Sequence, residues 1–566
     1  MKRNTLKGLF LVASASSLLG SCDLMKDVKY TVTPNPLEMH ADSVKINVSV
    51  ELPAKGIKKK ASAEITPMLG STALKTITVQ GEKVTGNGNV IQYKPGGKIS
   101  YSDVVAYKPD MENADLTVSG VIKKGTKEKD KIPTTKIADA TVITPLLVQK
   151  DFKCITEGDN FQRVTEKTFK AQINFDKSKS DLRKNEMKDK DIFEFQNWLA
   201  AAETNPKINI KTINVVGYAS PEGEQGKNES LSMDRATTGK KATVDLAKKF
   251  KNTKAQDSTI YSLSGRGEDY DGFKVELEKS MMAQDEKQLV IRVLEMYKDP
   301  VQRENEMRNM AKTFVYLDKN VFPLLRRSEI IVTYDLTGYT DEELVAISKT
   351  NPDKLTAEEI MFTATLTDDV SEKLRLYNEG CLLYPTDIRF HNNAGAMLFL
   401  QSNWADAGFK FEAANSLQDN AISKNNLGAI AGMKGEWAKA KKLFNEAKGA
   451  GSEVNYNLGY WSIKEGKYAD AIAKYGSENC FNKALAQLLN LTPDAAVKTI
   501  DASKDKETGM GYYLKAIAAA RMDKVDLVIS NLKSAFAKDA SLKAKAGKDR
   551  EFLKFKDNPN FTGSVQ

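Results

Sequence analysis

Alternation of apolar and polar residues dominates the first part of the chain. In the stretch DSVKINVSVEL, Val44, Ile46, Val48, Val50 and Leu52 alternate with polar residues. This period of two is typical of a half-buried β-strand. Similar short runs recur as far as DATVITPLL at residues 139–147, separated by turn sequences such as TGNGN and KPGGK. About seven strands without a helical period predict a β-sandwich over residues 22–148.

Strand-like and helix-like runs alternate between residues 150 and 337. TFKAQINFD is a strand candidate, and the next segment places Ile192, Phe195 and Leu199 on one helical face. A second strand ends at Gly217, a second helix follows, and STIYSLSGRGED and RSEIIVTYDL supply two further strands. A helical insertion over about 273–325 separates these last two strands. This order predicts an α+β domain of the βαβαβ type.

From residue 340 to 566 the pattern is helical and repeats itself. In each copy a Leu/Ala-Gly pair is followed by alanine and, four positions later, by an aromatic residue. The copies are Ala394-Gly395, Ala407 and Phe411; Leu427-Gly428, Ala440 and Phe444; and Leu458-Gly459, Ala471 and Tyr475. The glycines are spaced by 33 and 31 residues. The pattern resembles the tetratricopeptide repeat (TPR), whose unit is about 34 residues, and predicts an all-α solenoid.

Composition narrows the functional classes. The chain is 41% hydrophobic and 28% charged, which is ordinary for a folded protein. Its net charge of +9 is spread without a basic stripe carrying interleaved aromatics, so nucleic acid is not an expected partner. The two histidines, His40 and His391, lie far apart, and the cysteines show no metal-binding spacing. We therefore expect no enzymatic activity, no cofactor and no metal site.

The first residues resemble a bacterial lipoprotein signal. Lys2 and Arg3 precede an apolar run over 9–19 that is too short to span a membrane. The run ends in Leu-Gly-Ser before Cys22, which resembles the lipobox. The resemblance implies a signal peptide over 1–21, acylation of Cys22 and a protein that is anchored in the membrane rather than spanning it. The alternative is ordinary secretory cleavage beside an incidental cysteine.

The stretch GYASPEGEQGKNESLSMDRA, residues 217–236, resembles the peptidoglycan-binding loop and helix start of the OmpA C-terminal family. The residues that match the family pattern are Gly217, Gly223, Asn228, Leu231, Ser232, Arg235 and Ala236. The resemblance covers residues 168–337 apart from the insertion. Together with the lipobox and the repeats, the chain resembles an OmpA/TPR lipoprotein of the Bacteroidota type.

In the OmpA family a loop aspartate pairs with the ammonium of diaminopimelate, and the helix-start arginine pairs with a carboxylate. The resemblance implies the second role for Arg235, with Asn228 nearby, whereas Ser220 stands at the aspartate position. Replacing a charged hydrogen bond by a neutral one costs roughly 1–2 kcal/mol. Glu222, or less directly Glu224, supplies the missing charge in one interpretation. In the other both are solvated loop residues, and Arg235 is structural.

Asn393, Asn426 and Asn457 directly precede the Leu/Ala-Gly pairs of the three repeats. In TPR proteins this position can face the concave groove. The three amides therefore predict a ladder that holds the backbone of an extended peptide from a protein partner.

Two functional hypotheses follow. In the first, the protein is an outer-membrane lipoprotein and non-enzymatic scaffold that links the membrane to peptidoglycan through the OmpA-like domain and to a protein partner through the repeats. In the second, it is a structural subunit of an outer-membrane assembly, secretion or surface complex, and its OmpA-like domain no longer binds peptidoglycan; Ser220 and the insertion favour this. A periplasmic orientation fits an OmpA-like domain, whereas Lys26-Asp27 resembles a thin surface-export signal.

Overall fold

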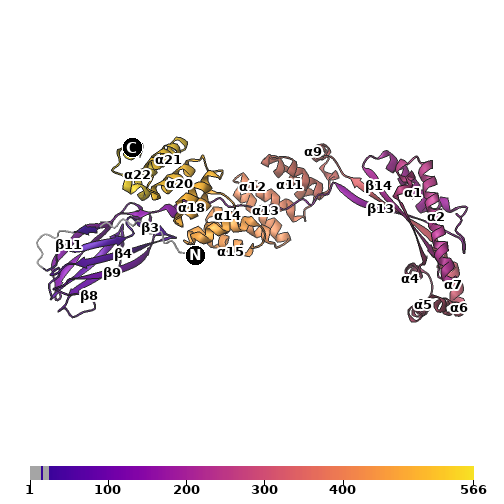
Figure 1. Ribbon diagram of the computed structural model, residues 1–566, viewed down its shortest axis with the longest axis horizontal. Coiled ribbons are helices and arrows are strands. Elements are labelled where there is room, and N and C mark those ends of the chain that lie inside the picture. The colour runs from indigo at the N-terminus through magenta and orange to yellow at the C-terminus, as the bar shows by residue number, and fades with distance from the viewer. Residues whose placement is uncertain (1–13, 17–23, 566) are drawn as a thin grey trace. The chain divides into compact units, whose positions relative to one another are not determined.

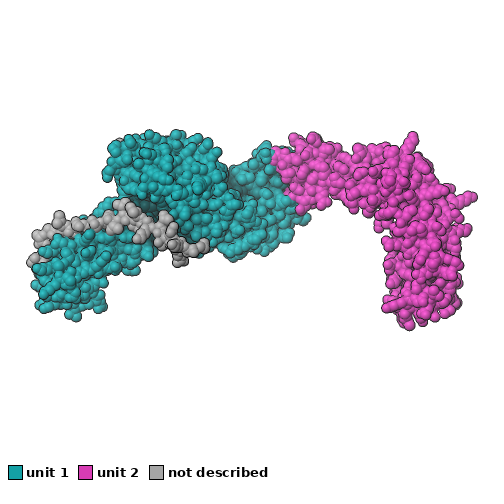
Figure 2. Space-filling model, viewed as in Figure 1, with its two compact units in different colours: residues 1–158, 368–566 teal, residues 159–367 magenta. Residues whose placement is uncertain are grey.

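The computed structural model describes residues 14–16 and 24–565. The chain forms two compact units, residues 1–158 with 368–566 (unit 1) and residues 159–367 (unit 2), as Figure 2 shows. Cys22 and almost all of the predicted signal peptide lie outside the described residues. Within them, none of the helices has the length and apolar character needed to cross a membrane.

The N-terminal part of unit 1 is built from two β-sheets that share one hydrophobic core (Figure 1). In β4 (Ser43–Leu52) the five apolar residues of the alternating pattern are at most 2% exposed, so the predicted half-buried strand is confirmed. The first sheet also holds β1 (Ser14–Ser16), β2 (Lys29–Thr33), β3 (Leu37–His40), β9 (Gly97–Ala106) and β12 (Thr141–Val142). The second holds β5 (Ala61–Leu69), β6 (Thr72–Ala73), β7 (Ile77–Gly81), β8 (Asn89–Ile91), β10 (Leu116–Lys124) and β11 (Lys127–Ala138).

The last predicted strand of this part is shorter than expected. Only Thr141–Val142 of DATVITPLL pairs, as β12, and the rest forms a short 3-10 helix, η2 (Thr144–Leu147). Pro145 is the reason, because proline has no N–H to donate to a sheet but is tolerated in the first turn of a helix. The chain therefore leaves the sheets at residue 143 and continues without regular secondary structure after η2.

Unit 2 contains a four-stranded sheet with helices packed against it. The strand order is β13 (Val164–Asn174), β16 (Arg327–Thr337), β14 (Ile208–Ala219) and β15 (Tyr261–Glu268). The β14–β15 pair is parallel and the other two pairs are antiparallel. The helices α1 (Lys190–Thr204) and α2 (Gln225–Lys249) connect the first three strands in sequence, and their apolar side chains share the core of the sheet.

Helix α2 lies unusually close to the sheet, because two glycines remove the side chains that would separate them. A Cβ atom on Gly217 of β14 would lie 1.9 Å from the main-chain oxygen of Ser232 in α2. A Cβ atom on Gly265 of β15 would lie 2.5 Å from the Ser232 hydroxyl. This close approach brings the first turns of α2, with Asn228 and Arg235, against the end of β14.

Five short helices form the insertion between β15 and β16. They are α4 (Tyr270–Lys279), α5 (Gln284–Met296), α6 (Pro300–Asn309), α7 (Lys312–Asn320) and α8 (Phe322–Leu325), and they bury a small core of their own around Phe273, Leu317 and Phe322. Two further helices, α9 (Asp341–Thr350) and α10 (Ala357–Thr363), also belong to unit 2. The division between the units thus falls after residue 367, whereas the sequence pattern placed the start of the repeats at residue 340.

The C-terminal part of unit 1 is a stack of antiparallel helix pairs (Figure 1). In the three repeats recognised from the sequence, the glycine of the first helix makes room for the aromatic ring of the second: a Cβ atom on Gly428 would lie 2.9 Å from the Phe444 ring. The helices are α11 (Val370–Leu383), α12 (Ile388–Leu400), α13 (Trp404–Leu417), α14 (Ala421–Lys434), α15 (Trp437–Glu446), α16 (Ser452–Lys464), α17 (Tyr468–Tyr475), α18 (Phe481–Leu489), α19 (Pro493–Asp501), α20 (Gly509–Arg521), α21 (Val525–Lys538), α22 (Ser541–Lys548) and α23 (Pro559–Val565).

Candidate functional site

Ser220 and Glu222 lie in the loop that joins β14 to α2. Their side chains are 4% and 8% exposed, and the Ser220 hydroxyl donates a hydrogen bond of 2.6 Å to Glu222 Oε1. Glu222 is therefore a buried carboxylate rather than a solvated loop charge. Glu224, by contrast, lies on the surface and pairs with Lys227.

Two cations of the chain itself surround the Glu222 carboxylate. Arg326, at the junction of α8 and β16, approaches Glu222 Oε1 with Nη2 at 2.6 Å and donates from Nε at 2.8 Å. Lys177 Nζ lies 3.3 Å from Glu222 Oε2. Asp318 of α7 pairs with both cations, at 2.9 Å in each case. The Glu222 carboxylate is thus paired with an arginine that directly follows the insertion.

Arg235 is buried and donates to three main-chain carbonyl groups. Its side chain donates to the carbonyls of Tyr218 at 2.8 Å, Lys179 at 3.0 Å and Asp176 at 3.3 Å, and the residue is 1% exposed. The guanidinium also lies 5.4 Å from the centre of the Phe175 ring. Burial lowers the pKa of Arg235 to about 10, so it stays charged at neutral pH. In this arrangement it ties α2 to the ends of β13 and β14.

Asn228 completes the loop. Its amide donates to the Ser220 carbonyl at 3.3 Å and to Glu268 Oε1 at 2.9 Å, and burial raises the pKa of Glu268. From the insertion, Arg308 of α6 donates to the Glu222 main-chain carbonyl at 2.7 Å. The four residues singled out from the sequence are therefore gathered around one loop, and each is hydrogen-bonded to groups of its own chain.

A second candidate site is the groove of the helical repeats, where the three predicted asparagines are 1% exposed or less. They stand on α12, α14 and α16, the first helices of consecutive repeats. All three hold the same segment, residues 149–157, which follows the N-terminal sheets and which we call the linker. The extended peptide in the groove thus belongs to the chain itself.

Each asparagine pairs with both main-chain groups of one linker residue. Asn426 accepts from the Ile155 N–H at 2.7 Å and donates to its carbonyl at 2.8 Å. Asn457 does the same with Lys153, at 2.8 Å in both directions, and Asn393 with Glu157, at 2.8 and 3.0 Å. Because the residues held are alternate ones, the linker presents one edge of an extended chain to the ladder, as a β-strand does to its neighbour.

Three further asparagines belong to the ladder and were not predicted. Asn482 of α18 pairs with both main-chain groups of Gln149, at 2.8 Å each. Asn392 and Asn425 connect the rungs by accepting from Asn426 at 2.8 Å and from Asn457 at 2.9 Å, and each also donates to a linker carbonyl. Asn482 was missed because no Leu/Ala-Gly pair follows it. Its sequence shares only a small residue with the other repeats, since Ala484 stands two positions after Asn482, where the others have glycine.

The linker is also anchored by apolar contacts. The Phe152 ring packs against Phe444 and Tyr460, with ring centres 5.7 and 5.1 Å apart. A Cβ atom on Gly432 would lie 2.5 Å from the Phe152 ring, so the absence of a side chain at this glycine leaves the space that the ring occupies. Burial raises the pKa of the neighbouring Cys154 thiol. A hollow of about 660 Å³ remains beside the linker, bordered by Leu400, which is 65% exposed.

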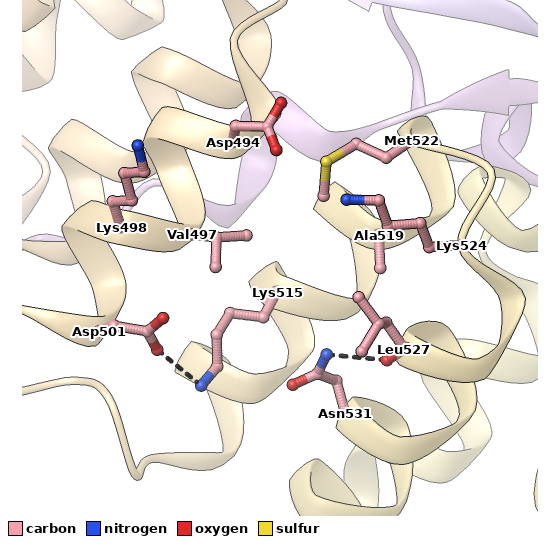
Figure 3. A pocket seen from close by; sticks show the side chains of 10 residues that line it. All are labelled: Asp494, Val497, Lys498, Asp501, Lys515, Ala519, Met522, Lys524, Leu527 and Asn531. Atoms are coloured by element: carbon pink, nitrogen blue, oxygen red, sulfur yellow. Dashed lines mark hydrogen bonds and ion pairs between the residues drawn. The ribbon is translucent and has the colours of Figure 1, made fainter.

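A further hollow of about 320 Å³ lies between α19, α20 and α21 (Figure 3). In it Lys515 pairs with Asp501 at 3.0 Å, and the Asn531 amide donates to the Leu527 carbonyl at 2.8 Å. Across residues 14–16 and 24–565, no group of three or more His, Cys, Asp or Glu side chains is placed to hold a metal ion.

Comparisons with known proteins add little. Neither a protein-family model nor a curated protein matches the sequence. Among solved structures, the chain is similar to the APC/C hetero-tetramer Cut9-Hcn1, with 10% identity and a TM-score of 0.31 over 60% of this chain and 71% of that chain. It is also similar to yeast Tom70, with 13% identity and a TM-score of 0.26 over 66% of this chain and 95% of that chain. At these scores the likeness carries no argument about function.

Proposed function

We propose that the protein is a lipid-anchored, non-enzymatic scaffold of the outer membrane, in which the OmpA-like central domain is a structural spacer and does not bind peptidoglycan. The observation that carries this proposal is the internal neutralisation of Glu222 by Arg326, both of which are less than 9% exposed. A ligand ammonium would have to replace an arginine that is already held by two carboxylates.

The anion half of the family site argues in the same direction. A diaminopimelate carboxylate would need N–H groups of Arg235, which is 1% exposed and bonded to three carbonyl groups. Freeing those N–H groups would break three hydrogen bonds made by a charged group, each worth about 1.5–3 kcal/mol. Binding at this loop would therefore require a rearrangement of the domain as well as the loss of the Arg326 pair.

Retention by peptidoglycan sacculi tests the spacer role. The full chain with Cys22→Ser, which removes the acylation site, is incubated with purified sacculi beside an OmpA-family domain that does bind them. We expect the protein to stay in the supernatant, with Arg235→Ala behaving as the parent does. Sedimentation that a diaminopimelate-containing stem peptide reverses, and that Glu222→Gln abolishes, would overturn the spacer role.

The scaffold role needs a separate test, because the sacculus experiment does not show which proteins the scaffold connects. Cross-linking in intact cells, followed by purification of the acylated protein, is expected to yield complexes with other outer-membrane proteins and no wall fragments. Recovery of the protein as a free, wall-bound monomer would contradict this and support the peptidoglycan-linking alternative. Protease treatment of intact cells would assign the membrane face, for which we propose the periplasmic side.

A further inference from the structure

We propose that a lysine-lined hollow in the N-terminal sheets binds the phosphate of an anionic phospholipid headgroup. The hollow measures about 510 Å³, and its charged lining consists of lysines alone: Lys58, Lys59, Lys60, Lys83 and Lys124. We call it the lysine hollow. The remaining lining residues are Leu24, Ala61 and Tyr93.

Three separate segments build the lysine hollow, so it is more than a basic run in one loop. Residues 58–60 lie just before β5, and Lys124 is the register partner of Ala61 at the end of β10. The Lys83 N–H donates to the Lys59 carbonyl at 2.8 Å. Gly81 permits this approach, because a Cβ atom there would lie 2.3 Å from the Lys58 carbonyl oxygen. The sheet thus holds the three segments together against the repulsion of their charges.

Ion pairs among the described residues compensate only part of the charge of the lysine hollow. Glu82 pairs with Lys59 at 2.9 Å. Its carboxylate also accepts the Tyr93 N–H at 2.8 Å, and this backbone hydrogen bond, with the contact to Lys59, lowers the pKa of Glu82. Within the described part of the chain, Lys60, Lys83 and Lys124 are exposed and have no ion-pair partner. An anion that bridges these ammonium groups would relieve their mutual repulsion.

The position of the lysine hollow near the predicted lipid anchor favours a phospholipid headgroup as the source of that anion. Leu24 lies in its wall, and the Leu24 carbonyl accepts from the Lys58 N–H at 2.9 Å. Cys22, the predicted acylation site, is two residues earlier, which is at most about 7 Å of extended chain. Acyl chains at that residue would hold the hollow within about one Debye length of the headgroups. A lysine near such a surface is attracted to anionic lipids. This step rests on the lipid anchor of the proposed function.

Vesicle binding by the unacylated Cys22→Ser full chain tests the inference without the anchor. The probes are vesicles of phosphatidylcholine alone and of phosphatidylcholine with phosphatidylglycerol. We expect binding to the second kind only, weakened at least about tenfold by the combined substitution K60Q/K83Q/K124Q. The matched control is K45Q/K108Q/K131Q, which removes the same charge from exposed lysines of the same N-terminal part of unit 1, outside the lysine hollow.

Three results would overturn the inference. The first is equal binding to both kinds of vesicle. The second is an equal loss in the control, which would show attraction by net charge alone. The third is binding of inorganic phosphate with the same lysine dependence but without vesicle binding, which would assign the site to a soluble phosphate compound. Because the chain used has no acyl group, failure here leaves the sacculus and cross-linking experiments unaffected.

Discussion

The substitution Asn426→Ala removes the central rung of the asparagine ladder. Asn426 makes four hydrogen bonds, two with Ile155, one with Asn392 and one with Asn425. The Ile155 carbonyl and the Asn425 amide keep a second partner each. The Ile155 N–H and the Asn392 side-chain oxygen do not, so two buried groups are left unsatisfied.

The expected magnitude follows from those two groups. An unsatisfied buried donor or acceptor costs about 1–3 kcal/mol, so the bound state of the linker should lose about 2–6 kcal/mol. Water entering through the hollow beside the linker would bring the loss toward the lower end of that range. Even about 2 kcal/mol raises the population of the released linker roughly thirtyfold.

Limited trypsin digestion measures this release, because Lys150 and Lys153 lie within the linker. When opening is fast relative to cleavage, the rate of cleavage after Lys153 follows the population of the open form. The matched control is Asn479→Ala, an exposed asparagine beside the same hollow. Hydrogen exchange of α20, at a distance along the solenoid, reports general unfolding. Equal cleavage of the variant and the parent, with α20 unchanged, would refute the reasoning.

Three further predictions follow. Arg326→Met strips the buried Glu222 of its closest cation and should lower the unfolding free energy of unit 2 by about 3–5 kcal/mol in denaturant titrations, with partial recovery in R326M/E222Q; an unchanged midpoint would contradict this. Burial raises the pKa of Asp549 to about 6, so its contribution to stability is complete below about pH 4 and is lost as the pH rises through 6; Asp549→Asn should flatten this trend in thermal melts, and an equal slope would count against it. Gly428→Ala should cost about 1–3 kcal/mol, because its Cβ atom would lie 2.9 Å from the Phe444 ring, and Phe444→Leu should offset part of the loss; a neutral Gly428→Ala would reject the packing argument.

Local patterns were enough to predict much of the secondary structure. The alternation over residues 43–52 identifies β4 because neighbouring residues decide which face of a strand is buried. The repeat spacing places Asn393, Asn426 and Asn457 on equivalent helices, because a helix pair that recurs fixes the register of its residues. Where one residue type overrides the pattern, as Pro145 does in η2, the strand prediction is wrong.

The partners of the candidate site residues were beyond such patterns. Asn426 meets Ile155 across 271 positions of the sequence, and Glu222 meets Arg326 across 104. The sequence indicates that a ladder of side-chain amides can pair with an extended backbone. It does not indicate which segment, because many segments of a chain can be extended. Likewise the sequence places Ser220 and Glu222 in one loop, but the arginine that neutralises Glu222 becomes identifiable only once the insertion is folded against the loop.

The two sites share one consequence for partner binding. In each, a group that would receive an external ligand is already bound by the chain: the amide ladder by the linker and Glu222 by Arg326. A partner peptide that uses the same amides must first release the linker, so its apparent affinity falls by the fraction of molecules in which the groove is open. A peptide that instead pairs with the outward edge of the linker avoids this cost, because residues 150, 152, 154 and 156 have no main-chain hydrogen bond within the described part of the chain. Strand addition at that edge, beside the hollow of about 660 Å³, is therefore the less costly way for an extended partner to bind.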